Sequence, residues 1–250
     1  MSRNLTRREF LAGLPGWFPF FWRRGRVTLG GVRWQVLDRG RAGTRYVMIH
    51  GNEETARRVL KDHMRQYPGK AYVVTGRARN VPFEGGVLDP NRMFSREGAE
   101  KNLRRLNPQW SAARLARALD QLDRLRPQLV EALTPPPGGL LLALHNNSEG
   151  YSVTDEVPIS DEVSLAAPAS PHEFFLATAP EDYAVLRTSP YNAVLQWHRP
   201  ADDDGSLSRL AARRGVRYVN LEAGLGRFDR QREMLDWAVA RLTPDRPHRK

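Results

Sequence analysis

Four residues of types that bind metal ions or transfer protons follow short apolar runs: His50, Glu53, His145 and Glu222. The runs themselves cover residues 46–49, 140–144 and 218–221. An apolar run of this length is typical of a buried strand. In open α/β sheets, ligands bind at the carboxyl ends of the strands. The sequence therefore predicts that these four side chains meet at one edge of a sheet.

The residue types indicate a zinc site. His50 and Glu53 are three positions apart, so both can reach one ion, and His145 supplies a third ligand. Two imidazoles and one carboxylate suit Zn²⁺ and leave one position open for water. Each residue alone is more typical of a hydrogen-bonded loop, and Glu222 could also be a fourth ligand or an ion-pair partner. The joint arrangement favours a metal centre.

The elements that position these residues alternate along the chain. Strands are expected around the Gly30-Gly31 turn within 27–38 and at 46–49, 71–75, 140–144, 174–177, 193–197 and 217–222. Helices are expected at 54–67, 95–106, from Ser111 onward, and at 181–187, 206–214 and 229–242. Residues 76–92 and 146–169 show no periodicity and are expected to be irregular. This order predicts a single-domain α/β fold, with a mixed, largely parallel sheet and helices on both faces.

Composition limits the function classes. The chain has 250 residues, 40% of them hydrophobic, which is enough for one sizeable core. It has no cysteine, so a metal site must be built from histidine and carboxylate. The net charge of +11 comes mostly from arginines. Because they are scattered along the chain, we expect solvated surfaces rather than nucleic-acid binding.

The amino terminus has its own pattern. Thr6-Arg7-Arg8-Glu9-Phe10-Leu11 matches the twin-arginine export signal. The apolar stretch after it is shorter than the ~20 residues that a transmembrane helix needs, and a basic aromatic arm is the alternative. We therefore divide the chain into a signal or arm (1–25), a catalytic domain (26–243) and a basic tail (244–250). If the segment is an export signal, the domain would act in the periplasm or at the cell surface; otherwise it would act in the cytoplasm.

The order of short motifs resembles that of the zinc carboxypeptidases and the related succinylglutamate desuccinylase/aspartoacylase group. The matching motifs are His50-Gly-Asn-Glu53, Asp89-Pro-Asn-Arg92, Leu144-His145-Asn146 and Asn220-Leu-Glu222. They span about residues 47–226. The chain has Asp-Pro-Asn-Arg where the family often has Asp-Leu-Asn-Arg. The segment between Asn147 and the motif that ends at Glu222 contains no family signature, so the substrate pocket is the part least defined by the resemblance.

The resemblance implies roles for individual residues. It makes Glu222 the general base and Arg79 the residue that polarises the scissile carbonyl, with Arg77 as the alternative. It assigns the free carboxylate of the substrate to Asn91 and Arg92.

The same resemblance extends to further substrate contacts. Asn146 would contact the substrate through its backbone. Tyr191 would supply a phenol, with Tyr151 and Tyr183 as alternatives. Among the remaining histidines, His63 is expected to be packed on the first helix rather than to bind metal.

The implied reaction is zinc-dependent hydrolysis of an amide beside a free carboxylate, in a peptide or in an N-acyl amino acid. For an exported protein, a cell-wall peptide is a natural substrate. A small-molecule deacylase and a non-catalytic binding protein that uses the same cleft remain alternatives. The oligomeric state does not follow from the sequence.

Overall fold

The computed structural model describes residues 23–147, 150–198 and 200–243. The twin-arginine motif and the basic tail from residue 244 lie outside these residues. No helix in the described part of the chain combines the length and the apolar character needed to cross a bilayer.

A nine-stranded sheet forms the centre of the fold, in the order β1-β2-β4-β3-β7-β11-β9-β10-β8. Its strands are β1 (Arg23–Leu29), β2 (Val32–Arg39), β3 (Thr44–Met48), β4 (Gly69–Val74), β7 (Leu140–Asn147), β8 (Glu162–Ser164), β9 (Phe174–Ala177), β10 (Asn192–Leu195) and β11 (Tyr218–Gly224). The central strands β4, β3, β7 and β11 are parallel, while β2 and β9 join them antiparallel. The predicted mixed sheet is confirmed, with its parallel pairs concentrated in the centre.

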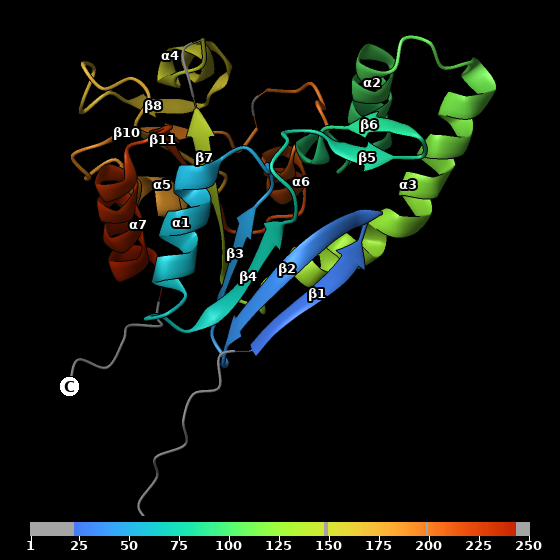
Figure 1. Ribbon diagram of the computed structural model, residues 1–250. Coiled ribbons are helices and arrows are strands. Elements are labelled where there is room, and N and C mark those ends of the chain that lie inside the picture. The colour runs from blue at the N-terminus through green and yellow to red at the C-terminus, as the bar shows by residue number, and fades with distance from the viewer. Residues whose placement is uncertain (1–22, 148–149, 199, 244–250) are drawn as a thin grey trace, which may run out of the picture.

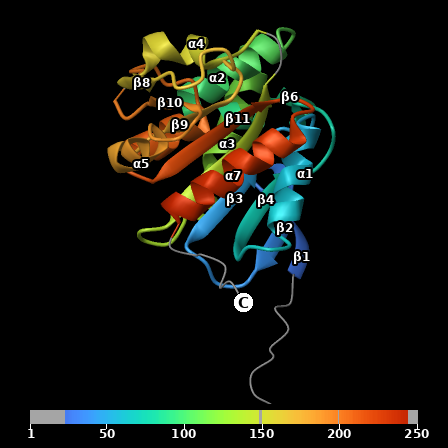
Figure 2. The same ribbon diagram turned by 90° about the vertical axis from the view of Figure 1, so that its left-hand side faces the viewer.

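Helices cover both faces of the sheet (Figures 1 and 2). They are α1 (Glu54–His63), α2 (Arg96–Leu106), α3 (Ala112–Leu133), α4 (Val153–Glu156), α5 (Pro180–Leu186), α6 (Leu207–Arg213) and α7 (Phe228–Leu242). Helices α1 and α7 lie side by side on one face, and α3 and α6 pack on the other. The described part of the chain forms one α/β domain with a continuous apolar core.

Local sequence explains the helix ends and faces. The side chain of Ser95 accepts a hydrogen bond from Gly98 N, and that of Ser111 accepts one from Arg114 N, as expected of N-cap residues. The predicted leucine stripe of α3 is buried at Leu115, Leu119, Leu122 and Leu129. Because these leucines recur at helical spacing, α3 buries one face against the sheet.

The interval from Gly76 to Arg92 is more regular than expected. It contains the hairpin of β5 (Val81–Phe83) and β6 (Gly86–Leu88), followed by the 3₁₀ helix η2 (Pro90–Arg92). Strands of three residues are too short to show a period in the sequence. Glu84 and Gly85, with φ of 49° and 71°, form the tight turn between them.

The interval after β7 also contains short elements, namely α4, a 3₁₀ helix η3 (Val157–Ile159) and the edge strand β8. Figure 1 shows α4 and β8 on one side of the carboxyl end of β7, with α2 and the β5–β6 hairpin on the other side. These two irregular intervals therefore flank the carboxyl ends of the central strands.

Candidate metal centre and active site

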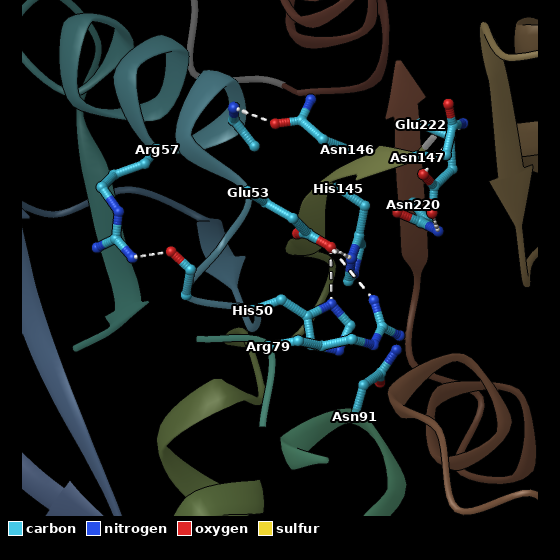
Figure 3. A network of polar contacts seen from close by, with 12 residues as sticks. His50, Glu53, Arg57, Arg79, Asn91, His145, Asn146, Asn147, Asn220 and Glu222 are labelled. Atoms are coloured by element: carbon cyan, nitrogen blue, oxygen red, sulfur yellow. Dashed lines mark hydrogen bonds and ion pairs between the residues drawn. The ribbon is translucent and has the colours of Figure 1, made fainter. Parts of the chain in front are cut away.

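His50, Glu53 and His145 converge at the carboxyl ends of two neighbouring parallel strands, as predicted (Figure 3). His50 follows β3, Glu53 is the N-cap residue of α1, and His145 lies near the end of β7. His50 Nδ1 is 2.7 Å from Glu53 Oε1, and His145 Nδ1 is 3.2 Å from Glu53 Oε2. All three ligand atoms lie within 4.8 Å of one another.

The cluster fits a metal ion by its burial and its donor chemistry. The three residues are 2%, 3% and 4% exposed, in chain order. Glu53 Oε2 lies 3.2 Å from His145 Nδ1 but makes no hydrogen bond among the described residues, although such a buried oxygen normally makes one. Two imidazole nitrogens and a carboxylate oxygen form a ligand set typical of catalytic zinc. His50, Glu53 and His145 could therefore hold Zn²⁺.

Electrostatic coupling within the cluster is strong. Burial alone would raise the pKa of Glu53. The nearby His145 and His50 outweigh this effect and lower the pKa to about 2. Burial lowers the pKa of His145, but the carboxylate of Glu53 outweighs this effect and raises it. The carboxylate is thus ionised at neutral pH, as a metal ligand must be.

Asp89 orients His50, a role that the sequence did not reveal. Its Oδ1 lies 2.9 Å from His50 Nε2, on the side of the ring opposite Glu53. A carboxylate in this position fixes the tautomer of a metal-binding histidine and directs its other nitrogen to the metal. Burial raises the pKa of Asp89, yet the hydrogen bond from His50 and the charges of His50 and Arg79 hold it well below its usual range.

Glu222 stands beside the cluster on β11, directly opposite His145 in the strand register. It is outside the set of three ligand atoms found within 4.8 Å of one another in the described residues. Its carboxylate accepts hydrogen bonds from Asn220 Nδ2 at 3.1 Å and from Asn147 Nδ2 at 3.4 Å. Burial raises the pKa of Glu222 to about 7. A carboxylate with this pKa can accept and release a proton near neutral pH.

Arg79, rather than Arg77, points to the cluster (Figure 3). Its guanidinium lies 3.3 Å from Asp89 Oδ2 and 4.0 Å from Glu53 Oε1. Arg77 is exposed and does not line the cavity described below. Of the two arginines, Arg79 is therefore the one that lies beside the cluster of His50, Glu53 and His145.

Asn91 and Arg92 line the same cavity from η2. Asn91 Oδ1 accepts a hydrogen bond from Leu207 N at 3.0 Å, which ties this turn to the start of α6. Arg92 is half-buried, and its Nη2 lies 3.5 Å from the exposed carboxylate of Asp204. Its Nη1 donates to Asn91 O at 2.7 Å, so both terminal nitrogens of Arg92 have partners within the wall of the cavity.

Asn146 and Tyr191 were also expected to contact the substrate, but other parts of the protein hold both side chains. Asn146 borders the cavity, but its side chain is engaged: Oδ1 accepts from Ala56 N, and Nδ2 donates to Ala223 O and Gln231 Oε1. Tyr191 is not among the residues that line the cavity. Its ring packs edge-on against Phe175, and the guanidinium of Arg230 covers it. The structure therefore does not bring Tyr191 to the site, whereas its alternative, Tyr151, lines it.

His63 is packed away from the cluster, as predicted. It is 3% exposed, its Nε2 is 3.0 Å from the hydroxyl of Tyr46, and its ring stacks on Tyr67. It is thus a suitable control for experiments on the metal ligands.

A cavity of about 560 Å³ opens from the cluster. Tyr218, Asn220 and Glu222 all line it, because alternate residues of β11 share one face of the sheet. This period of two is the signal that could have identified Tyr218 and Asn220 from the sequence. Tyr151, Glu156, Gln196 and Arg209 form a further part of the wall and come from segments with no such signal.

Comparison with known proteins gives structural neighbours only. No family model matches the sequence, and no curated protein matches it. Among solved structures, a succinylglutamate desuccinylase/aspartoacylase from Rhodobacter sphaeroides aligns at 14% identity, over 91% of this chain and 67% of its own, with a TM-score of 0.45. The ectoine utilization protein EutE (DoeB) from Ruegeria pomeroyi aligns at 13% identity, over 88% of this chain and 66% of its own, with a TM-score of 0.47.

A third neighbour is a candidate metallopeptidase from Shewanella amazonensis SB2B. It aligns at 14% identity over 88% of each chain, with a TM-score of 0.43. The chain thus spans about two thirds of the first two neighbours and most of the third. These similarities are too low to assign a function to the chain. The functional argument therefore rests on the geometry of the site.

Proposed function

We propose that this protein is a zinc-dependent amide hydrolase of the carboxypeptidase type, which cleaves an amide bond next to a free carboxylate. The observation that carries the proposal is the buried cluster of His50, Glu53 and His145 with Glu222 beside it. A cluster of metal-binding groups next to a carboxylate with a raised pKa is typical of metal-assisted hydrolysis.

His50, Glu53 and His145 would hold the zinc ion. When bound, the ion would supply Lewis acidity toward a carbonyl oxygen and a water molecule. Glu222 would take a proton from the attacking water and deliver it to the leaving amine nitrogen, since its pKa of about 7 allows both transfers. Asn220 and Asn147 hold its carboxylate in place through their amide groups.

The arginines of the cavity would bind and polarise the substrate. Arg92 offers a planar pair of N–H groups that suits a carboxylate, and Asn91 adds a polar group beside it. Arg79 lies next to the metal ligands, where it could stabilise negative charge on the carbonyl oxygen. A substrate held at both points would present its amide carbon to the cluster.

An N-acyl amino acid deacylase is the second candidate. The cavity of about 560 Å³ has the size of a small-molecule site, which an N-acyl amino acid could fill without a peptide chain.

A substrate panel tests the proposal. It compares peptides with a free terminal carboxylate, the same peptides capped as amides, and N-acyl amino acids, on zinc-loaded protein. We expect efficient cleavage only of free peptides. Equal rates on free and capped peptides would reject the carboxypeptidase assignment, activity confined to N-acyl amino acids would favour the deacylase, and binding without turnover would indicate a non-catalytic protein.

Substitution of Arg92 sharpens this test. Arg92→Ala should lower kcat/KM for free peptides by about 10- to 150-fold, because a charged hydrogen bond contributes ~1.5–3 kcal/mol. The loss should disappear for capped peptides, which have no carboxylate for Arg92. Arg105→Ala, on the exposed surface of α2, is the matched control.

We further propose that the protein is exported, with a cell-wall peptide as its substrate. The support for export is the Arg7-Arg8 motif in the sequence.

A further inference from the structure

A second group of polar side chains, two of them charged, lines the cavity. Glu156 ends α4, Gln196 follows β10, and Arg209 lies on α6. All three residues line the cavity, together with Tyr151. They are nevertheless almost fully buried, since Glu156 is 9% and Arg209 is 7% exposed. We call Glu156, Gln196 and Arg209 the polar wall.

Gln196 connects the two charged residues of the polar wall and separates them. Its amide nitrogen donates to Glu156 Oε2, and its amide oxygen accepts from Arg209 Nη2. Tyr151 donates its hydroxyl to Glu156 Oε1 at 2.6 Å, and Arg209 Nη1 donates to Pro200 O at 3.1 Å. The wall is therefore held in position by neutral partners alone.

Neither charged residue forms a direct ion pair within the described part of the chain, although the carboxylates of Asp204 and Glu156 are close enough to interact with the charge of Arg209. Residues 23–147, 150–198 and 200–243 place no oppositely charged group within 4.0 Å of Glu156 or of Arg209. A buried charge is costly unless an opposite charge pairs with it. A guanidinium has more N–H donors, and a carboxylate more acceptor sites, than the bonds described above use. Both side chains can thus bind a charged ligand group in the cavity.

We infer that the polar wall recognises a zwitterionic group on the substrate: a carboxylate that binds Arg209 and an ammonium that binds Glu156. The inference rests on the proposed function, in which Arg92 binds the carboxylate next to the scissile amide. The leaving residue would then be a diamino dicarboxylic acid, whose side chain ends in an ammonium and a carboxylate of its own. One amino-acid head would bind at Arg92 and the other at the polar wall.

Four amino acids serve as probes of this site. Each is acetylated on one α-amino group, so that this end offers Arg92 only its carboxylate, and each is tested on chelator-treated protein, so that the acetyl group is not hydrolysed. They are 2,6-diaminoheptanedioic acid, with both distal groups; lysine, with only the distal ammonium; 2-aminoheptanedioic acid, with only the distal carboxylate; and 2-aminoheptanoic acid, with neither. Titration calorimetry on the purified full chain measures their affinities. We expect the first to bind most tightly, with a loss of about 10- to 150-fold for each missing charged group. Equal affinities for all four would overturn the inference without any variant.

Two substitutions assign the groups to their partners. Glu156→Gln should reduce the affinity for 2,6-diaminoheptanedioic acid and lysine, and leave 2-aminoheptanedioic acid unchanged. Arg209→Gln should reduce the affinity for the two probes with a distal carboxylate, and leave lysine unchanged. Exposed Glu162→Gln and Arg213→Gln, the latter on the same helix as Arg209, are the controls.

The outcomes separate this inference from the proposed function. An equal loss for all four probes in either variant would show a structural role and overturn the inference, even if the enzyme hydrolyses amides. Selective losses in a protein that hydrolyses no amide would support the polar wall and reject the proposed reaction. If Arg209→Gln does not fold, Arg209→Lys keeps the charge and should retain the preference for a distal carboxylate. Loss of that preference in the folded Arg209→Lys variant would overturn the assignment of the distal carboxylate to Arg209.

Discussion

Replacement of Glu222 by glutamine separates the chemistry of this residue from its packing. The substitution keeps the shape of the side chain but removes the group that accepts a proton. Because a general base contributes about 10²- to 10⁴-fold, Glu222→Gln should lower kcat by this factor. The variant should bind zinc as wild type does, because Glu222 is outside the ligand cluster.

Glu222→Gln should also change how the stability of the protein depends on pH, and the burial of Glu222 sets the size of this change. Burial raises the pKa of Glu222 from 4.5 to about 7, so the folded state of the metal-free protein favours the protonated form. The contribution of Glu222 to the free energy of unfolding is therefore fully present below pH 4.5 and is lost as the pH rises through about 7. The pKa change corresponds to about 3 kcal/mol. Glutamine does not titrate, so the variant should lack this loss.

Urea unfolding of chelator-treated wild type and Glu222→Gln at pH 5 and pH 8 measures the effect. The variant should gain about 2–3 kcal/mol relative to wild type between these two values. The exposed Glu131→Gln is the control and should show no such gain. A stability difference that does not change with pH would refute the conclusion that burial raises the pKa of Glu222.

Three further predictions follow from the contacts of the site and from the amino terminus. Asp89→Asn should weaken zinc binding by about 10- to 100-fold in a competition titration, because it removes the carboxylate that orients His50; unchanged affinity would contradict this role. Asn146→Ala should lower the free energy of unfolding by about 1–3 kcal/mol in urea, since it breaks the contacts of the amide, while the folded variant keeps its zinc; full stability would show these contacts to be dispensable. Arg7→Lys with Arg8→Lys should retain the protein in the cytoplasm on fractionation, and unchanged export would leave the segment as a basic arm.

The cluster of His50, Glu53 and His145 was predictable because its geometry follows from a simple rule. His50 and His145 each end an apolar run, and parallel strands place their carboxyl ends at one edge of a sheet. The register of β7 and β11 then sets Glu222 opposite His145. The sheet class and the helix caps at Ser95 and Ser111 followed from equally local patterns.

The polar wall of the cavity was not predictable, for a physical reason. Glu156, Gln196 and Arg209 lie in three separate elements, and only tertiary packing brings them together. No periodicity marks residues that meet in this way. Tyr191 illustrates the converse, because a residue type that suits a substrate contact is held by Phe175 and Arg230 away from the cavity.

The metal content of the purified protein tests the central claim most directly. Elemental analysis after equilibration with zinc and removal of the excess should find zinc bound to wild type at close to one ion per chain. His50→Ala and His145→Ala should each lose most of it, because the shell then lacks one protein ligand. His63→Ala, whose imidazole is buried outside the cluster, should retain it. Absence of zinc from wild type, or full occupancy in both ligand variants, would contradict the assignment of the metal centre.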